Sequence, residues 1–392
     1  MPTHSPALAA QDSLAWFEHT MAETVEETLH LCRIPAPTFE EAERAAYVAE
    51  RMQAIGLAGV HIDPIHNVTG IVGDGTAQPT VMVVAHIDTV FPRTTPLEAR
   101  CTPKRLYGPS IGDNCVAVAA MLRVATALQH LPTRPPGRVI FAASVGEEGL
   151  GNLCGIRALL DTWQGQVDTV IAVEGHGLDE VRIAGIGSTR LEVTFQGPGG
   201  HSWGAFGTPS AIHAMGHAIH TLAQIKLPAS PRTTYNVGLV SGGESVNTIA
   251  SCASMVVDMR SVEPPALHGL ETQVAQLLHA VEQQSGIKVT SRIVGQRPAA
   301  AMPANHPLCT GLLAIRRQLH LRPPIFGAAS TDANWPLSRQ IPAVCLGITH
   351  GGLAHTVKEY IDIPPIERGL KQLFCTILHT LTHPECGVWQ AP

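Results

Sequence analysis

The sequence predicts an α/β domain that is built from both ends of the chain and interrupted by a smaller domain. In the first half, short continuous apolar runs alternate with amphipathic stretches, as buried strands alternate with helices in a layered sheet. Between residues 186 and 296, strand and helix patterns follow in the order β-α-β-β-α-β, which is typical of a ferredoxin-like fold. The α/β pattern then resumes, and 392 residues suffice for two domains.

The elements of the α/β domain come in a regular order. It begins with amphipathic helices at residues 12–31 and 39–55, the second with Thr38 as its N-cap. Buried strands are expected at residues 81–85, 138–144 and 169–173, with a helix at about 117–129. After the insertion, helices are expected at about 306–319 and 367–381 with a strand at 343–346 between them. These segments predict a discontinuous domain of residues 1–185 and 297–392.

The inserted domain is expected to span residues 186–296. Its strands are predicted at residues 186–196, 233–240, 251–260 and 287–294, and its helices at 209–225 and 264–284. A glycine-rich turn, residues 241–243, joins the two middle strands.

Composition excludes several classes of protein. With 45% hydrophobic and 15% charged residues the chain does not resemble a disordered protein. A net charge of −6 argues against nucleic-acid partners and anionic membrane surfaces. No uninterrupted apolar run approaches the ~20 residues that span a bilayer, and no basic-then-apolar leader opens the chain. We therefore expect a cytoplasmic protein.

The cysteines and histidines constrain any metal site. The nine cysteines include no C-x-x-C pair, which disfavours both a disulfide framework and a thiolate zinc site. The 20 histidines are the unusual count. A metal ion in this protein would be bound by imidazole and carboxylate groups, which suit zinc, manganese or cobalt.

A His-x-Asp triplet follows the first predicted strand. Ligands in open α/β sheets gather beyond the carboxyl ends of strands, where His86 and Asp88 are expected. One ring nitrogen of His86 could bind a metal ion while the carboxylate orients the other. The triplet carries little weight alone, because His61-Ile-Asp63 has the same form; no strand end is expected at that second triplet, and a proline follows it.

Carboxylates follow the next strands. Glu147 and Glu148 lie in a turn flanked by Gly146 and Gly149, where one carboxylate could bind a cation and the other could accept a proton. The pairs at residues 26–27 and 40–41 are instead expected on solvated helix faces. Glu174 ends the third apolar run, and Asp113 precedes a helix, where an N-cap role is the structural alternative.

The order of these groups resembles that of a known family. His86-x-Asp88, Asp113, Glu147-Glu148, Glu174 and the late segment His355-Thr-Val-Lys-Glu-Tyr360 are similar to the M20 metallopeptidases over about residues 12–382. That family includes peptidase T-like tripeptidases, acetylornithine deacetylase, succinyl-diaminopimelate desuccinylase and glutamate carboxypeptidase. The resemblance implies a phosphorylase/hydrolase-like α/β domain with a dinuclear zinc site and an inserted ferredoxin-like dimerisation domain.

The resemblance also implies a set of metal ligands. One divalent ion would be held by His86 and Glu174, the other by Glu148 and His355, with Asp113 bridging them. The ions are expected to be zinc, with manganese or cobalt as alternatives.

Further roles follow from the same resemblance. Asp88 would orient His86, and Glu147 would be the general base. His355 is preferred to His350 as the ligand because only His355 is followed by T-x-x-E-Y.

The inserted domain carries family-like segments too. His201, in Gly197–Ser202, would stabilise an oxyanion in the site of the neighbouring protomer of a homodimer. Asn247 would contact substrate; Arg260 would either pair with a substrate carboxylate or form a structural salt bridge. Ser330 and Thr331, in the later α/β segment, would line the substrate pocket.

The resemblance leaves the substrate class open. Asn114 and Cys115 after Asp113 favour the peptidase T-like branch, whereas Glu174 in place of aspartate favours deacylases and carboxypeptidases. The expected reaction is hydrolysis of an amide in a small peptide, with an N-acyl amino acid as the alternative substrate. A non-catalytic binding homologue is disfavoured, because it would be expected to have lost a metal ligand or the base, and all of them are present.

Overall fold

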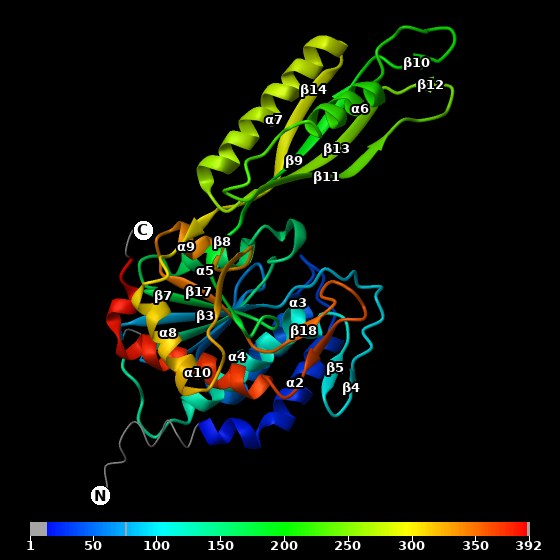
Figure 1. Cartoon of the computed structure of the whole chain (residues 1–392). Coiled ribbons are helices and arrows are strands. Elements are labelled where there is room, and N and C mark those ends of the chain that lie inside the picture. Colours follow the sequence, from blue (N-terminus) through cyan, green and yellow to red (C-terminus); the bar gives the residue numbers. More distant parts are fainter. Residues whose placement is uncertain (1–13, 75–76, 390–392) are drawn as a thin grey trace, which may run out of the picture. The chain divides into compact units, whose positions relative to one another are not determined.

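The computed structural model describes residues 14–74 and 77–389. The chain divides into two compact units (Figure 1). The larger unit comprises the chain up to Gly185 and from Ala301 onward, and the smaller unit is Ile186–Ala300. The sequence places the second boundary at residue 296; in the structure β14 runs to Arg297 and moves it to Ala300.

The larger unit is organised around a nine-stranded sheet. Along the sheet the strands are β1 (Ala58–Ile62), β2 (Val68–Gly73), β6 (Arg138–Ser144), β3 (Thr80–His86), β7 (Thr169–Glu174), β17 (Ala343–Gly347), β8 (Glu180–Gly185) and β15 (Ala300–Ala301), with β16 (Ile325–Ala329) also paired to β8. The four central strands β6, β3, β7 and β17 are parallel, and nearly all their residues are buried. The strands predicted at residues 81–85, 138–144, 169–173 and 343–346 are these four.

Helices cover this sheet, and a smaller sheet lies beside it. The helices are α2 (Met21–Arg33), α3 (Ala42–Ile55), η1 (Ile111–Cys115), α4 (Val116–Gln129), η2 (Gly149–Gly151), α5 (Cys154–Thr162), α8 (Pro307–Gln318), α9 (Asn334–Ser338), α10 (Ile366–Thr382) and η3 (Pro384–Gly387). The small sheet has the order β18 (Gly351–Gly352), β19 (Tyr360–Asp362), β5 (Arg105–Tyr107) and β4 (Arg100–Cys101).

Two helix predictions differ from the structure in detail. The helix expected over residues 12–31 begins outside the described residues, and its described part breaks at Thr20 into a helical segment over 14–19 and α2. Thr38 does not cap α3, whose N-cap is Glu41; the Thr38 hydroxyl donates to Asp88 instead.

The most apolar helix is part of the core. Within the described part of the chain, only Ile111–Gln129 is long and apolar enough to cross a membrane, and 89% of its most apolar window is buried inside the protein. Its regular portion, α4, has 14 residues. That length is about 21 Å, which is short of the roughly 30 Å hydrocarbon core of a bilayer.

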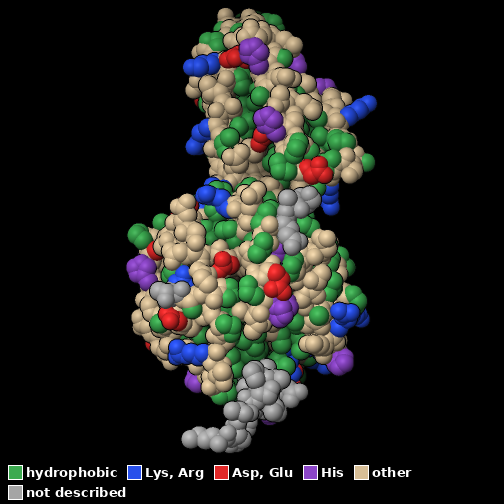
Figure 2. Space-filling model, turned by 90° about the vertical axis from the view of Figure 1, so that its left-hand side faces the viewer, with side chains coloured by type: hydrophobic (Ala, Val, Ile, Leu, Met, Phe, Trp, Pro, Cys, Tyr) green, Lys and Arg blue, Asp and Glu red, His purple; other side chains and the backbone are tan. Residues whose placement is uncertain are grey.

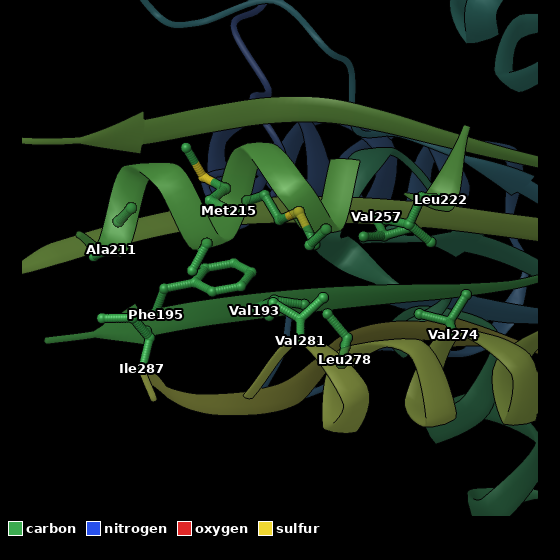
Figure 3. Close-up of a cluster of buried hydrophobic side chains, with 14 of the residues drawn as sticks. Val193, Phe195, Ala211, Met215, Leu222, Val257, Val274, Leu278, Val281 and Ile287 are labelled. Carbon is green, nitrogen blue, oxygen red and sulfur yellow. The ribbon is translucent and has the colours of Figure 1, made fainter. Parts of the chain in front are cut away.

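The smaller unit is an antiparallel sheet with two helices. Its main elements are β9 (Gly187–Gln196), α6 (Ala211–Leu222), β11 (Thr233–Gly242), β13 (Cys252–Ser261), α7 (Pro264–Ser285) and β14 (Lys288–Arg297), with the short pair β10 (Gly200–His201) and β12 (Thr248–Ile249). The strand order is β11-β13-β9-β14. Figure 3 shows buried side chains of the sheet, such as Val193 and Phe195, clustered with those of α6 and α7. Alternate residues of β13 face this cluster, so the other sheet face carries more exposed side chains.

Candidate metal centre

The predicted ligands lie at one edge of the large sheet. His86 is the last residue of β3 and Glu174 the last residue of β7, while Glu147 and Glu148 follow shortly after β6. Because these strands are parallel, their carboxyl ends meet at the same edge. Asp113 lies in η1, just before α4, and is not that helix's N-cap.

Two clusters of candidate ligands share one carboxylate. His86, Asp113 and Glu174 form one group, and Asp113, Glu148 and His355 form the other, with the ligand atoms of each within 4.8 Å of one another. His86 Nε2 is 3.1 Å from Asp113 Oδ1, whereas His355 Nε2 is 3.0 Å from Oδ2. Each oxygen of Asp113 therefore faces a different cluster. The side chain of His355 is half-exposed. Figure 2 shows acidic and histidine side chains on the visible surface of the larger unit.

Asp88 contacts residues of both clusters and orients them. Its two carboxylate oxygens accept hydrogen bonds from the backbone N–H groups of Glu147 and Glu148, each at 2.9 Å. The carboxylate also lies 3.5 Å from His86 Nδ1, whose other neighbour is the Asp88 carbonyl oxygen at 3.2 Å. A proton on Nδ1 leaves the Nε2 lone pair of His86 directed at Asp113 and Glu174.

The turn that carries the two glutamates depends on glycine. Gly146 has a φ of 62°, and a side chain there would come within 2.3 Å of Cys154 Sγ. Glu41 Oε1 accepts the Gly146 N–H at 3.2 Å, so this turn is tied to the N-terminal segment as well.

The residue after Asp113 links that segment to the end of β7. Asn114 is buried; its side-chain amide donates to the carbonyl of Val173 and accepts the N–H of Gly175, both at 2.9 Å. These bonds fix the backbone on both sides of Glu174. In the sequence Asn114 is visible only as a departure from the family pattern, because its partners lie about 60 positions away.

The neighbouring carboxylates raise the pKa values of both histidines in the clusters. Burial lowers the pKa of His86, but its hydrogen bonds to Asp113, Asp88 and Glu174 outweigh burial and raise that pKa well above its ordinary value. Hydrogen bonds to Asp113 and Glu148 raise the pKa of His355 to about 10. Burial opposes ionisation of Asp113, yet the two imidazoles lower its pKa. Without a cation, protons on the imidazoles supply the positive charge that these carboxylates require.

The donor set suits divalent metal ions. Both clusters consist of imidazole nitrogens and carboxylate oxygens without any cysteine, which fits zinc, manganese or cobalt. The fixed Nδ1 contact of His86 orients the ring as expected of a metal-binding histidine.

Two glutamates expected on solvated helix faces are buried instead. Glu27 accepts hydrogen bonds from Tyr47 and Arg51, and Glu41 accepts the N–H groups of Phe39 and Gly146. Local patterning could not reveal this, because most of the donors lie on other segments. Their neighbours in sequence, Glu26 and Glu40, are not buried.

Predicted substrate residues of the larger unit lie close to the centre. Ser144, the last residue of β6, donates to Asp332 at 2.5 Å, so the Ser330–Thr331 segment lies beside the end of that strand. Thr331 is buried, and its backbone N–H donates to the side chain of Asn334. Burial raises the pKa of Asp332 to about 6.

In the smaller unit, His201 and Asn247 are brought together, but Arg260 is not. His201 on β10 pairs with Thr248 on β12, and the Asn247 carbonyl accepts the N–H of Ser202. Arg260 is near the other end of β13, where it forms an ion pair with Asp258 at 2.7 Å. That contact favours the structural alternative for Arg260.

The comparisons with known proteins agree with this geometry. The sequence profile of "Peptidase family M20/M25/M40" matches residues 82–379. The acetylornithine deacetylase of Myxococcus xanthus is 29% identical over 292 residues, covering 70% of this chain and 73% of that protein. A crystal structure of a tripeptidase from Staphylococcus aureus has a TM-score of 0.79 at 20% identity, covering 93% of this chain and 99% of that one.

A third comparison concerns metal content. A Bacillus subtilis protein described as a dinuclear metal binding peptidase from the M20 family has a TM-score of 0.69 at 14% identity, covering 93% of this chain and 99% of that one. At such identities the two structures establish a shared fold, while the family profile covers more than half of the chain. The chain belongs to peptidase family M20/M25/M40 and is a metal-dependent hydrolase.

Proposed function

We propose that this protein is a dinuclear-metal exopeptidase that hydrolyses an amide bond of a di- or tripeptide. The observation that carries the proposal is the pair of ligand clusters that share Asp113, next to a glutamate whose backbone is held by Asp88. His86 and Glu174 would hold one ion, Glu148 and His355 the other, and Asp113 both. Zinc is the expected metal, with manganese or cobalt as alternatives.

Glu147 is the proposed general base. It is adjacent to the ligand Glu148 and buried, and its N–H donates to the same Asp88 carboxylate that holds Glu148. Neighbouring residues in a turn point in different directions, so one carboxylate can bind a metal ion while the other accepts a proton. The bound cations supply Lewis acidity, which lowers the pKa of water and polarises the scissile carbonyl.

Glu147 takes one proton from the attacking water while the oxygen of that water bonds to the carbonyl carbon of the substrate. When the carbon–nitrogen bond breaks, Glu147 returns that proton to the departing amine. The products are a carboxylic acid and an amine, so atoms and charges balance with water as the only co-reactant.

His201 is the proposed oxyanion donor. Its Nδ1 accepts the N–H groups of Trp203 at 3.2 Å and Gly204 at 3.3 Å, which places the ring proton of the neutral imidazole on Nε2. Nε2–H is then available to donate to the oxygen that gains negative charge. Asn247, bonded to Ser245, is proposed to contact the substrate beside it.

We propose that the smaller unit is a ferredoxin-like dimerisation domain. Its element order and its strand order β11-β13-β9-β14 support this topology. β11 is an edge strand on which Leu239 and Val240 are 68% and 60% exposed, and Figure 2 shows hydrophobic side chains on the surface of this unit. An exposed apolar edge strand needs a partner, and a second copy of this chain is the proposed one. His201 would then serve the site of the neighbouring protomer.

The second candidate function is deacylation of an N-acyl amino acid. It is favoured by the 29% identity with an acetylornithine deacetylase, whereas the tripeptidase structure shares only the fold. Both reactions cleave an amide near a free carboxylate. Ser330 and Thr331 would line the pocket in either case. Arg260 could meet a substrate carboxylate with its terminal nitrogens while its Nε stays hydrogen-bonded to Asp258. A cytoplasmic location is proposed, in keeping with nine free cysteines.

A substrate panel tests the proposal. The protein, freed of metal by chelation, is reloaded with Zn²⁺, Mn²⁺ or Co²⁺ and given dipeptides, tripeptides and N-acyl amino acids. Metal-dependent release of amino acids from peptides, faster than from acyl compounds, is the expected result. The reverse preference would replace the exopeptidase by the deacylase, and full activity of verified metal-free protein would contradict both.

A further inference from the structure

One buried glutamate outside the ligand clusters contacts their backbone. Glu359 lies four residues after His355 and is completely buried. Its Oε1 lies 2.8 Å from the N–H nitrogen of Asp113 and 3.1 Å from that of Gly112. The same oxygen lies 2.7 Å from His176 Nε2. A single carboxylate oxygen therefore receives three donors from two distant segments.

Those segments all carry proposed ligands. Gly112 and Asp113 belong to η1, and His176 lies two residues after Glu174 at the end of β7. Glu359 itself follows the loop of His355 and directly precedes β19. One side chain thus joins the backbone around Asp113, the segment after Glu174 and the segment after His355.

The packing around Glu359 and His176 leaves no space for a side chain at two neighbouring glycines. A side chain at Gly112 would come within 2.2 Å of His176 Nε2 and 2.8 Å of Glu359 Oε1. At Gly351, next to the His355 loop, a side chain would come within 2.6 Å of the His176 ring. Glycines at these positions permit the close approach of the three segments to the Glu359–His176 pair.

Burying the Glu359 carboxylate at this position costs free energy that a side chain serving only to fill space would not cost. Glu359 Oε2 is buried and has no hydrogen-bond partner among the described residues. Burying a polar oxygen without a partner costs roughly 1–3 kcal/mol. A hydrophobic or amide side chain would fill this space without a buried charge. Hydrogen bonds to a charged acceptor are about twice as strong as those to a neutral one, so a carboxylate holds the Asp113 backbone more firmly.

We infer that Glu359, with His176, is a positioning pair that holds Asp113 so that each of its oxygens faces one of the two ligand clusters. This inference rests on the proposed dinuclear function and assigns the pair no contact with substrate. Loss of residues that orient metal ligands lowers metal affinity or activity by roughly 10- to 100-fold. The pair acts on both ions, because Asp113 belongs to both clusters.

The test is Co²⁺ affinity of the full chain, measured by competition with a chromophoric chelator and followed by the visible absorption of bound Co²⁺. Glu359→Gln keeps the shape of the side chain and removes its charge. Glu27→Gln is the matched control, because Glu27 is also buried and hydrogen-bonded but lies in α2 between Tyr47 and Arg51. We expect Glu359→Gln to weaken Co²⁺ binding at least about tenfold relative to this control, the lower end of the range for residues that orient metal ligands. A smaller change overturns the inference.

A second pair of variants separates positioning from packing. His176→Ala removes one donor to Glu359, whereas His176→Gln retains an N–H that can reach it. Co²⁺ affinity should fall in the first variant and return in the second; equal loss in both would overturn the role of the hydrogen bond. Failure of the proposed function is recognised separately, because the wild-type protein would then bind no Co²⁺ at this site at all.

Discussion

The edge of the large sheet and the β10–β12 region of the smaller unit present polar groups in opposite ways. At the sheet edge, His86 and Asp88 are buried, and the bond from His355 to Asp113 joins residues 242 positions apart. In the β10–β12 region, His201 and Asn247 are exposed, and their side chains bond to residues two or three positions away. The buried groups are fixed by hydrogen bonds between segments that are far apart in the chain. The exposed groups lack such links, and in the proposed homodimer the partner would cover them.

The largest effect is expected at the sheet edge. Glu147→Gln should lower kcat by about 10²- to 10⁴-fold, because it removes the proton acceptor. Two bound metal ions should remain, since Glu147 belongs to neither cluster. Glu148→Gln, the neighbouring control, should lose metal. Elemental analysis of both variants decides the assignment, and metal loss in Glu147→Gln with retention in Glu148→Gln would reverse it.

In the exposed β10–β12 region, substitution of His201 should also lower kcat, and its effect should be reversible by a second chain. His201→Ala should lower kcat by about 10²- to 10³-fold, as for other oxyanion donors, with unchanged metal content. Mixing it with Glu147→Gln under conditions of subunit exchange should restore part of the activity. A mixed dimer would contain one site with an intact base and an intact His201 from the other chain. If exchange is demonstrated and no activity returns, His201 does not serve a neighbouring protomer.

A smaller effect is expected from Asp88, which positions the residues of the sheet edge and takes no part in the reaction itself. Asp88→Asn keeps the size of the side chain, but its amide group cannot accept both glutamate N–H groups on separate oxygens. Metal affinity or kcat should fall roughly 10- to 100-fold. Thr38→Val is the milder control, since it removes only the hydroxyl bond to Asp88. An Asp88→Asn enzyme with unchanged affinity and rate would show that Asp88 does not position this site.

The smallest effect concerns pH. The raised pKa values of His86 and His355 stabilise the metal-free fold fully below the ordinary histidine value of 6.5, and this contribution is lost as pH rises towards about 10. Cations compete with the same protons, so metal affinity should increase over that range. Thermal unfolding between pH 6 and 10 should therefore show a growing gap between metal-loaded and metal-free protein. A gap that narrows with pH would contradict the assignment of these two histidines.

Sequence patterns predict the metal ligands at the sheet edge better than the residues that position them. His86 and Glu174 are identifiable because each ends a continuous apolar run, and parallel strands bring such ends together. The supporting roles of Glu41 and Glu359 cannot be read from the sequence, because both accept backbone N–H groups of distant segments; the T-x-x-E-Y segment includes Glu359 but gives it no role. Arg260 is ambiguous in the sequence for a related reason: its Asp258 partner is two residues away, but only the fold shows that the two side chains meet.

The central claim is that two metal ions share Asp113. Anomalous diffraction from crystals of the protein loaded with Zn²⁺ tests it most directly. We expect two anomalous peaks, one in contact with His86 and Glu174 and one in contact with Glu148 and His355, with Asp113 touching both. A single peak, or two peaks of which Asp113 contacts only one, would contradict the claim.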